Sequence, residues 1–474
     1  LFPSDKIKTL NAATEQWGHT GESHWSLVSY MLRVSYDYNT KYLFTGTLRR
    51  DGSSRFGPEN RWGYFPSVSV GWNITKEDFF PDLQWLANLK LRTSYGFSGN
   101  NDIGNYTWIP NVFSADYTTG GSVGNGKALA EMGNRQLSWE LSRELDIGMD
   151  MSLLEGKLNF TFDYYKNITE NMLWNVDVPI SSGYGSIIRN IGKVRNRGVE
   201  FSINSINISN DNFNWETNFN ISFNRNKVLD LGDVERIKYG WRNIGYTTEG
   251  KPMAMIYGWH ELGIFKNDEE VEKYPTFPSQ WAPGTPRFED INGDGILSKE
   301  DKMIIGDPHP AFRGGISNRL RYKNWDFSIS MSFAHDFDVY AGLEHDVLNT
   351  RGVFNVTTDI KNRWKSPEEP GDNDTSMSFD IRQIAYDHWP NSSIVYNASF
   401  LKIQNLSLGY NFENMGFANQ FRLYCSIQNP HIFTNYRYGN PDVSHWGNNS
   451  LLPNYDKYDY PLAQTIVLGV NVNF

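Results

Sequence analysis

Apolar and polar side chains alternate with a period of two along most of this chain, and this alternation restricts its fold more than any other feature. In residues 26–38, Tyr30, Leu32, Val34 and Tyr36 share one face, while the other face is mainly polar. Strict alternation over about ten residues is typical of a β-strand with one apolar and one polar face. The chain is therefore expected to be all-β.

Thirteen segments show this pattern. They are residues 26–38, 42–50, 64–74, 88–97, 139–151, 157–166, 197–206, 213–223, 311–321, 325–335, 399–411, 419–429 and 463–474. A strand of about 9–11 residues, tilted by about 45°, is long enough to cross a bilayer. The pattern predicts a transmembrane antiparallel β-barrel with lipid against the apolar face and water against the polar one.

The connections between these segments alternate in length, which also favours a membrane barrel. Residues 39–41, 153–156, 207–212 and 323–324 are short turns, and residues 75–87 and 412–418 are moderately short. The long connections are residues 51–63, 98–138, 167–196, 224–310, 336–398 and 430–462. Outer-membrane barrels have short periplasmic turns and long extracellular loops. The alternative is a secreted propeller or tandem sandwich, whose strands would be shorter, about 5–6 residues.

Composition excludes several other classes. Aromatic residues make up 15% of the chain, which excludes a disordered protein. No run approaches the roughly 18 apolar residues of a transmembrane helix. The formal net charge of −10 argues against nucleic acid as a partner. The single cysteine, Cys425, excludes a disulfide framework or thiolate cluster within the chain.

Strand parity predicts that more of the barrel precedes this chain. Bacterial single-chain barrels have even strand numbers, whereas thirteen is odd. If the closing strand, residues 463–474, ends on the periplasmic side, the first strand runs inward. Residues 1–25 are then an extracellular loop, and residues 224–310 are a second, much longer one. We expect residues 1–474 to be the C-terminal part of a larger barrel.

Several sequence blocks, in order, carry a family resemblance. They are Arg49–Gly57, Arg61–Ser67, Gly71–Trp72, Leu91–Asn100, Asn190–Gly192, Asn196–Glu200, Arg287–Gly295 and Ile305–Pro308. Together they resemble the SusC-like (SusC/RagA) subgroup of TonB-dependent outer-membrane transporters, typical of Bacteroidota. The resemblance runs from about residue 25 to the C-terminus.

This resemblance implies a 22-stranded barrel in a Gram-negative outer membrane, closed by an N-terminal plug domain that is not in this chain. Nine strands would precede the thirteen seen here. It also implies a SusD-like surface lipoprotein as partner, TonB acting through the plug, and import of glycans or peptides. Two alternatives remain: a plugless barrel serving as a structural scaffold or surface binding complex, and a secreted carbohydrate-active β-protein.

One motif in the longest loop predicts a metal site. Residues 290–301 match the calcium loop of EF-hands, with the sharp turn at Gly295. The candidate ligands are Asp290, Asn292, Asp294, Ile296 through its carbonyl, Ser298 and Asp301. Asp301 stands where a longer Glu usually binds. The alternative is a loop built on Asx-turns without a metal.

Tryptophans in the long loops are candidates for ligand binding because aromatic faces stack on sugar rings. These candidates are Trp108, Trp241, Trp259, Trp281, Trp389 and Trp446. The alternative is packing among the loops or against the lipoprotein. Catalytic signals are weak: the sequence has no Gly-x-Ser-x-Gly, no phosphate-binding Gly-x-x-x-x-Gly-Lys followed by Ser or Thr, and no His-Glu-x-x-His. No organic cofactor and no enzymatic activity are expected.

Overall fold

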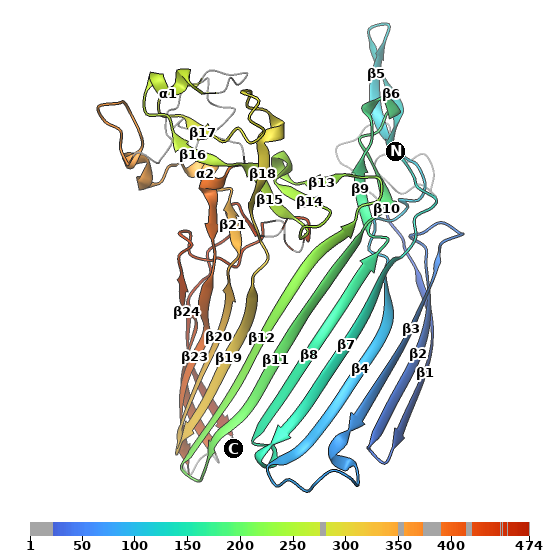
Figure 1. Cartoon of the computed structure of the whole chain (residues 1–474), viewed down its shortest axis with the longest axis vertical. Helices are drawn as coiled ribbons and strands as arrows, with labels where there is room; N and C mark the ends of the chain where they lie inside the picture. Colours follow the sequence, from blue (N-terminus) through green and yellow to red (C-terminus); the bar gives the residue numbers. More distant parts are fainter. Residues whose placement is uncertain are drawn as a thin grey trace. The chain divides into compact units, whose positions relative to one another are not determined.

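The computed structural model describes residues 22–274, 281–348, 355–372, 390–413, 420–445, 447, 449–452 and 454–473. Thirteen strands of this described part form one large sheet, in which hydrogen-bonded neighbours follow chain order (Figure 1). They are β1 (Leu27–Tyr38), β2 (Tyr42–Ser53), β3 (Trp62–Asn73), β4 (Leu86–Asn100), β7 (Glu140–Leu153), β8 (Leu158–Glu170), β11 (Lys193–Ser209), β12 (Phe213–Asp230), β19 (Phe312–Tyr322), β20 (Trp325–His335), β23 (Phe400–Glu413), β24 (Gln420–Thr434) and β26 (Thr465–Asn473). We refer to them as the wall strands.

The wall strands confirm the predicted fold class. Each of the thirteen predicted segments overlaps one of them, and Phe474 alone of the closing segment lies outside the described residues. The main difference is length. Strand β12 continues to Asp230, seven residues beyond the predicted end at Phe223. Alternation is imposed only where lipid covers one face, whereas hydrogen-bonded pairing can continue beyond the bilayer.

Strand register keeps like faces together across the wall. Between β19 and β20, the pairs Ile316–Met331, Leu320–Phe327 and Tyr322–Trp325 alternate with Arg319–Ser328 and Arg321–Asp326. The apolar row continues into β23 and β24 through the pairs Phe327–Leu408 and Leu408–Cys425. Because side chains alternate between faces, this register gives the paired strands one apolar and one polar surface.

A β-bulge interrupts this alternation at one point. The pairing of β23 with both neighbours shifts at Gln404, between Ile403 and Asn405. Opposite it, in β24, Asn429 has a positive φ of 51° and is followed by Pro430. Pro lacks an N–H and is tolerated in a sheet at such bulges. The extra residue returns Leu406 and Leu408 to the apolar face.

The chain divides into two compact units, which are described separately. The first comprises Leu1–Asn73, Arg92–Ile147 and Lys166–Arg195. Within it, the hairpin of β5 (Asn111–Thr119) and β6 (Ser122–Glu131) turns at two glycines of positive φ, Gly120 and Gly121. A short pair, β9 (Leu173–Asp177) and β10 (Ser186–Asn190), lies in the same unit. Its buried core consists of Phe56, Phe65, Ile103, Leu137 and Trp139.

The second unit comprises Ile74–Leu91, Gly148–Tyr165 and Asn196–Phe474. Its long loops fold into small sheets that we call the loop assembly (Figure 1). One sheet contains β13 (Arg236–Tyr239), β14 (Gly245–Thr248), β15 (Met255–Trp259) and β18 (Lys302–Gly306); another contains β21 (Asp338–Ala341), β22 (Val395–Asn397) and β25 (Tyr455–Asp456); β16 (Glu261–Ile264) pairs with β17 (Pro286–Phe288). The helices α1 (Asp268–Glu272) and α2 (Glu344–Val347) belong to it. In the described part of the chain, no helix has the length and hydropathy to span a membrane.

Candidate functional site

A pocket of about 610 Å³ lies in the second unit, where wall strands meet the loop assembly. Most of its lining side chains come from the polar face of the wall. Register places Ser222 opposite Arg313, Arg313 opposite Ala334, and Ala334 opposite Phe400, so these positions share one face. The wall residues that line the pocket include Thr161, Asp163, Glu200, Ser202, Asn220, Ser222, Arg313, Ser332 and Gln404. We call this the wall pocket.

The chemistry of the wall pocket suits a polar, oligomeric ligand. Its lining includes the basic residue Arg313 and the acidic residues Asp163, Glu200 and Asp442. Glu200 is held by the Ser222 hydroxyl, which donates to its Oε1 at 3.2 Å. The remaining polar lining consists of hydroxyl and amide groups, which both donate and accept hydrogen bonds. Such a surface offers many directional contacts.

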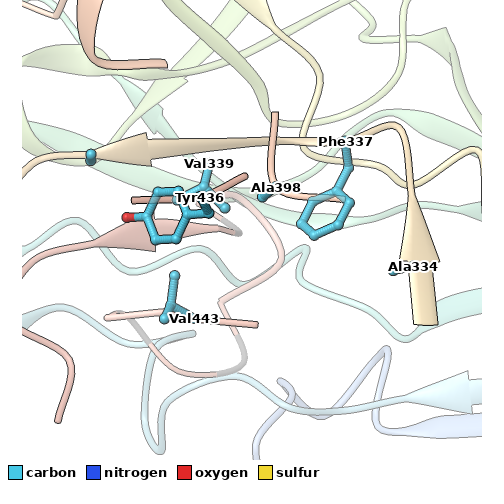
Figure 2. Close-up of a cluster of buried hydrophobic side chains, with 7 residues drawn as sticks. Ala334, Phe337, Val339, Ala398, Tyr436 and Val443 are labelled. Atoms are coloured by element: carbon cyan, nitrogen blue, oxygen red, sulfur yellow. The ribbon is translucent and has the colours of Figure 1, made fainter. Parts of the chain in front are cut away.

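Apolar packing closes the pocket on the loop side. Phe337 and Ala334 line the pocket and also belong to a buried cluster with Val339, Ala398 and Tyr436 (Figure 2). Val443, labelled below Tyr436 in the same view, belongs to this cluster as well. The cluster joins the end of β20 to segments that are distant in sequence, and so fixes the loops against the pocket.

A buried carboxylate organises the loops beyond this cluster. Glu344, at the start of α2, accepts hydrogen bonds from the hydroxyls of Tyr396 at 2.7 Å and Tyr438 at 2.8 Å. Burial raises the pKa of Glu344, an effect that the two hydroxyls and Arg437 oppose. Arg437 lies 3.8 Å from Glu344 and also pairs with Asp359. The network ties four loop segments together, those around Glu344, Asp359, Tyr396 and Arg437.

The structure separates the predicted tryptophans. Trp259 and Trp281 both contact Phe288, and Trp259 is 1% exposed, so its indole is covered by protein. Trp241 is half-buried and stacks at a tilt against His345, with ring centroids 5.1 Å apart. Trp108 packs against the core of the first unit, and its buried indole N–H has no hydrogen-bond partner among the described residues. Trp389 and Trp446 lie outside the described residues. Ligand binding by these residues stays a prediction.

The predicted calcium loop forms a compact series of Asx-turns. Asp290 accepts the amides of Gly293 at 2.8 Å and Gly295 at 3.0 Å, and Asp294 accepts that of Ile296 at 2.7 Å. Asp301 is fully buried, and its Oδ2 accepts the Ser298 amide at 2.6 Å. Across the described residues, no group of three His, Cys, Asp or Glu side chains converges as metal ligands do. The loop is thus ordered by its own backbone hydrogen bonds.

The wall-pocket residues were not among the sequence-predicted site residues. One signal could have indicated some of them: Asn220 and Ser222 occupy polar-face positions at the loop-side end of an alternating segment. The sequence does not show which polar positions of different strands converge, because convergence depends on strand stagger across six wall strands.

Comparison with known proteins gives a consistent result. The model of the family described as TonB dependent receptor-like, beta-barrel matches residues 3–429. TonB-dependent receptor P3 of Formosa agariphila is 36% identical over 465 residues, covering 94% of this chain and 45% of that protein. TonB-dependent receptor SusC of Bacteroides thetaiotaomicron is 30% identical over 463 residues, covering 95% and 44%. The chain therefore spans about half the length of the curated relatives that it matches.

Solved structures show the same fold. The structure of the RagAB peptide transporter aligns with a TM-score of 0.80 at 24% identity, covering 100% of this chain and 51% of that chain. The RagAB peptide importer in its open-open state aligns with a TM-score of 0.77 at 23% identity, covering 99% and 50%. At this level of identity the likeness concerns the fold alone.

Proposed function

Because this chain belongs to the TonB dependent receptor-like β-barrel family, we propose that it forms the C-terminal part of the barrel of a SusC-like importer. The family is one of Gram-negative outer-membrane receptors and transporters, not of enzymes. The proposed importer takes up oligomeric nutrients, either glycans or peptides. A plug and the earlier strands of the same protein would complete the barrel, and TonB would act through that plug.

The wall pocket is the observation that carries this proposal. It lies on the polar face of the wall, which in a barrel faces the lumen. Its hydroxyl, amide and charged groups offer a ligand many replaceable hydrogen bonds, none of which requires bond chemistry. An oligomer entering through the loops would meet this surface next. A SusD-like surface lipoprotein is the proposed partner that covers the loops from outside.

The role of the pocket can be tested by transport. We expect Arg313→Ala to slow growth on the oligomeric nutrient that the wild-type gene supports, and to reduce uptake of its labelled form. Arg319→Ala is the matched control, because Arg319 lies on the same face of β19 but does not line the pocket. Equal uptake by both variants, at equal outer-membrane abundance, would refute the pocket's role.

A second test separates the importer from a plugless scaffold. The protein is extracted in detergent and its native complex is analysed by mass spectrometry, with and without denaturation. The importer requires a plug-bearing polypeptide and a lipoprotein in the complex. A barrel without either would support the scaffold instead.

We also propose that residues 290–301 bind calcium and so stiffen the longest loop. The donors are hard oxygens of Asp290, Asn292, Asp294 and Asp301, which suit calcium. Each carboxylate oxygen of Asp290 and Asp294 accepts one hydrogen bond and retains a lone pair. Calcium should protect the loop from proteolysis, whereas Asp294→Ala should abolish that protection. Equal protection in EDTA would contradict this proposal.

A further inference from the structure

A second pocket, also of about 610 Å³, lies on one face of the four-stranded sheet β13-β14-β15-β18. Its basic lining residues are Arg236, Lys238, Lys251, Lys299 and Lys302, and Glu300 is the acidic residue among those that line it. This concentration of cations contrasts with the net charge of −10 of the whole chain. We call it the cationic pocket.

Successive side chains of each strand point to opposite faces of the small sheet, and this brings the basic residues together on one face. Arg236 and Lys238 in β13 face the same way, while Ile237 between them is buried. The opposite side of the sheet packs on a core that includes Ile256 and Ile305. One face of the sheet therefore packs on an apolar core, and the other face carries basic side chains.

Of the five basic side chains that line the pocket, Arg236 alone is paired with a carboxylate among the described residues, that of Glu235 at 3.6 Å. Within the described part of the chain, Lys238, Lys251, Lys299 and Lys302 form no ion pair. Lys302 lies 5.6 Å from the centre of the Trp259 ring, and Lys238 lies 5.4 Å from that of Tyr257. Burial, together with Lys238, Lys299 and Arg242, lowers the pKa of Lys302 to about 8. Several cations held close together and partly buried make a favourable environment for an anion.

The position of the pocket argues for a sugar rather than a peptide. Peptides commonly bind sheets at an exposed edge, through backbone hydrogen bonds. Here the ligand would meet the face of the sheet, where backbone groups are already paired and only side chains are available. Those side chains are the cations, the Thr248 hydroxyl and the parallel rings of Tyr246 and Tyr257, whose centroids are 4.2 Å apart.

We propose that the cationic pocket binds a sugar residue carrying an oxyanion, such as sulfate, phosphate or carboxylate. Its source is either the imported oligosaccharide, a role that rests on the proposed function, or the lipopolysaccharide around the barrel. Lysine ammonium groups bind the oxyanion as point charges, and hydroxyl groups hold the ring.

Isothermal titration of the detergent-purified full-length protein tests the proposal. The probes are dextran sulfate oligosaccharides and uncharged dextran oligosaccharides of the same length. We expect the sulfated probe to bind, the uncharged one not to bind, and affinity to fall as salt increases. Lys238→Met with Lys302→Met should weaken binding by about tenfold or more, since the two substitutions remove ammonium groups that form charge-assisted hydrogen bonds to the oxyanion.

Two further double variants serve as controls, one for misfolding and one for a nonspecific effect of charge. Lys251→Ala with Lys299→Ala changes only exposed pocket residues and should also weaken binding. Lys266→Ala with Lys361→Ala removes the same charge from exposed loop positions outside the pocket and should change affinity less than about twofold. Equal loss in the pocket and control variants would overturn the site.

Two more probes identify the ligand class. Poly-glutamate of matched charge that binds as tightly as the sulfated probe would overturn the assignment to a sugar. Deacylated lipopolysaccharide bound in preference to dextran sulfate, and lost in the pocket variants, would assign the site to the membrane's own glycolipid. Binding is measured without uptake, so a failure here and a failure of import are separate results.

Discussion

The wall strands and the loop assembly are stabilised and specified by different kinds of interaction. In the wall, each side chain faces one of two environments, and neighbouring residues face opposite ones. In the loop assembly, order comes from small cores whose members are far apart in sequence. One such core joins Ile244, Tyr340, Ile394 and Tyr455. The wall is therefore specified locally, whereas the loops depend on contacts that only the folded chain brings together.

The largest expected effect tests the loop side of this comparison. Trp259→Ala should destabilise the loop assembly by about 3–5 kcal/mol, because it removes a fully buried indole that packs on Phe288. Hydrogen-exchange mass spectrometry should show lost protection over residues 255–306 with the wall unchanged. Trp241→Ala, at a half-buried position, should cost much less. Full protection in the Trp259 variant would instead favour a role in ligand binding.

The next effect tests the wall. Ile329 and Ser330 are neighbours in β20 but belong to its apolar and polar faces. Ile329→Arg should destabilise the barrel by about 2–4 kcal/mol in lipid, since it places a charge toward the hydrocarbon. Ser330→Arg should be tolerated because the lumen is wet. Urea unfolding from vesicles measures both variants; equal losses would mean that the two faces are not distinguished by lipid.

The smallest effect is a pH dependence within the loop assembly. The pKa of Lys302 is lowered from its ordinary 10.5 to about 8, chiefly by burial. A lowered pKa means that the protonated amine opposes folding; this opposition is complete below pH 8 and is relieved as pH rises toward 10.5. Wild-type loop stability, measured relative to Lys302→Met, should therefore increase between these pH values. A constant difference across that range would argue against a buried Lys302.

The difference between the wall and the loop assembly also explains which strands could be predicted from the sequence. All thirteen wall strands could be predicted from the alternation of apolar and polar residues, because successive side chains face lipid and water in turn. The small strands β13 to β18 were not predicted, since segments of three to five residues carry too little periodicity. The ends of long strands such as β12 were also missed, because Asn224 to Asp230 leave the region where alternation is required.

Prediction of candidate sites was similarly uneven. The motif at residues 290–301 was visible because its ligands are adjacent in sequence. The two pockets were not, because Arg313 and Gln404, or Lys238 and Lys302, converge only through strand pairing. For Trp259, residue type suggested a binding role, but exposure is a property of the fold and could not be read from the sequence.

The bulge at Gln404 has a consequence for how such walls evolve. In a regular strand, one additional residue reverses the orientation of every side chain on one side of it; without the bulge, Gln404 would turn Leu401 toward water and Lys402 toward lipid. The bulge leaves this residue out of the alternation, so that Ile403 and Leu406 share a face although they are three residues apart. A change of length within a wall strand is thus tolerated only where a bulge absorbs it or a second change in the same strand compensates for it. Lineages should therefore vary wall strands by substitution and confine insertions and deletions to the loops, where new specificities arise without disturbing the barrel.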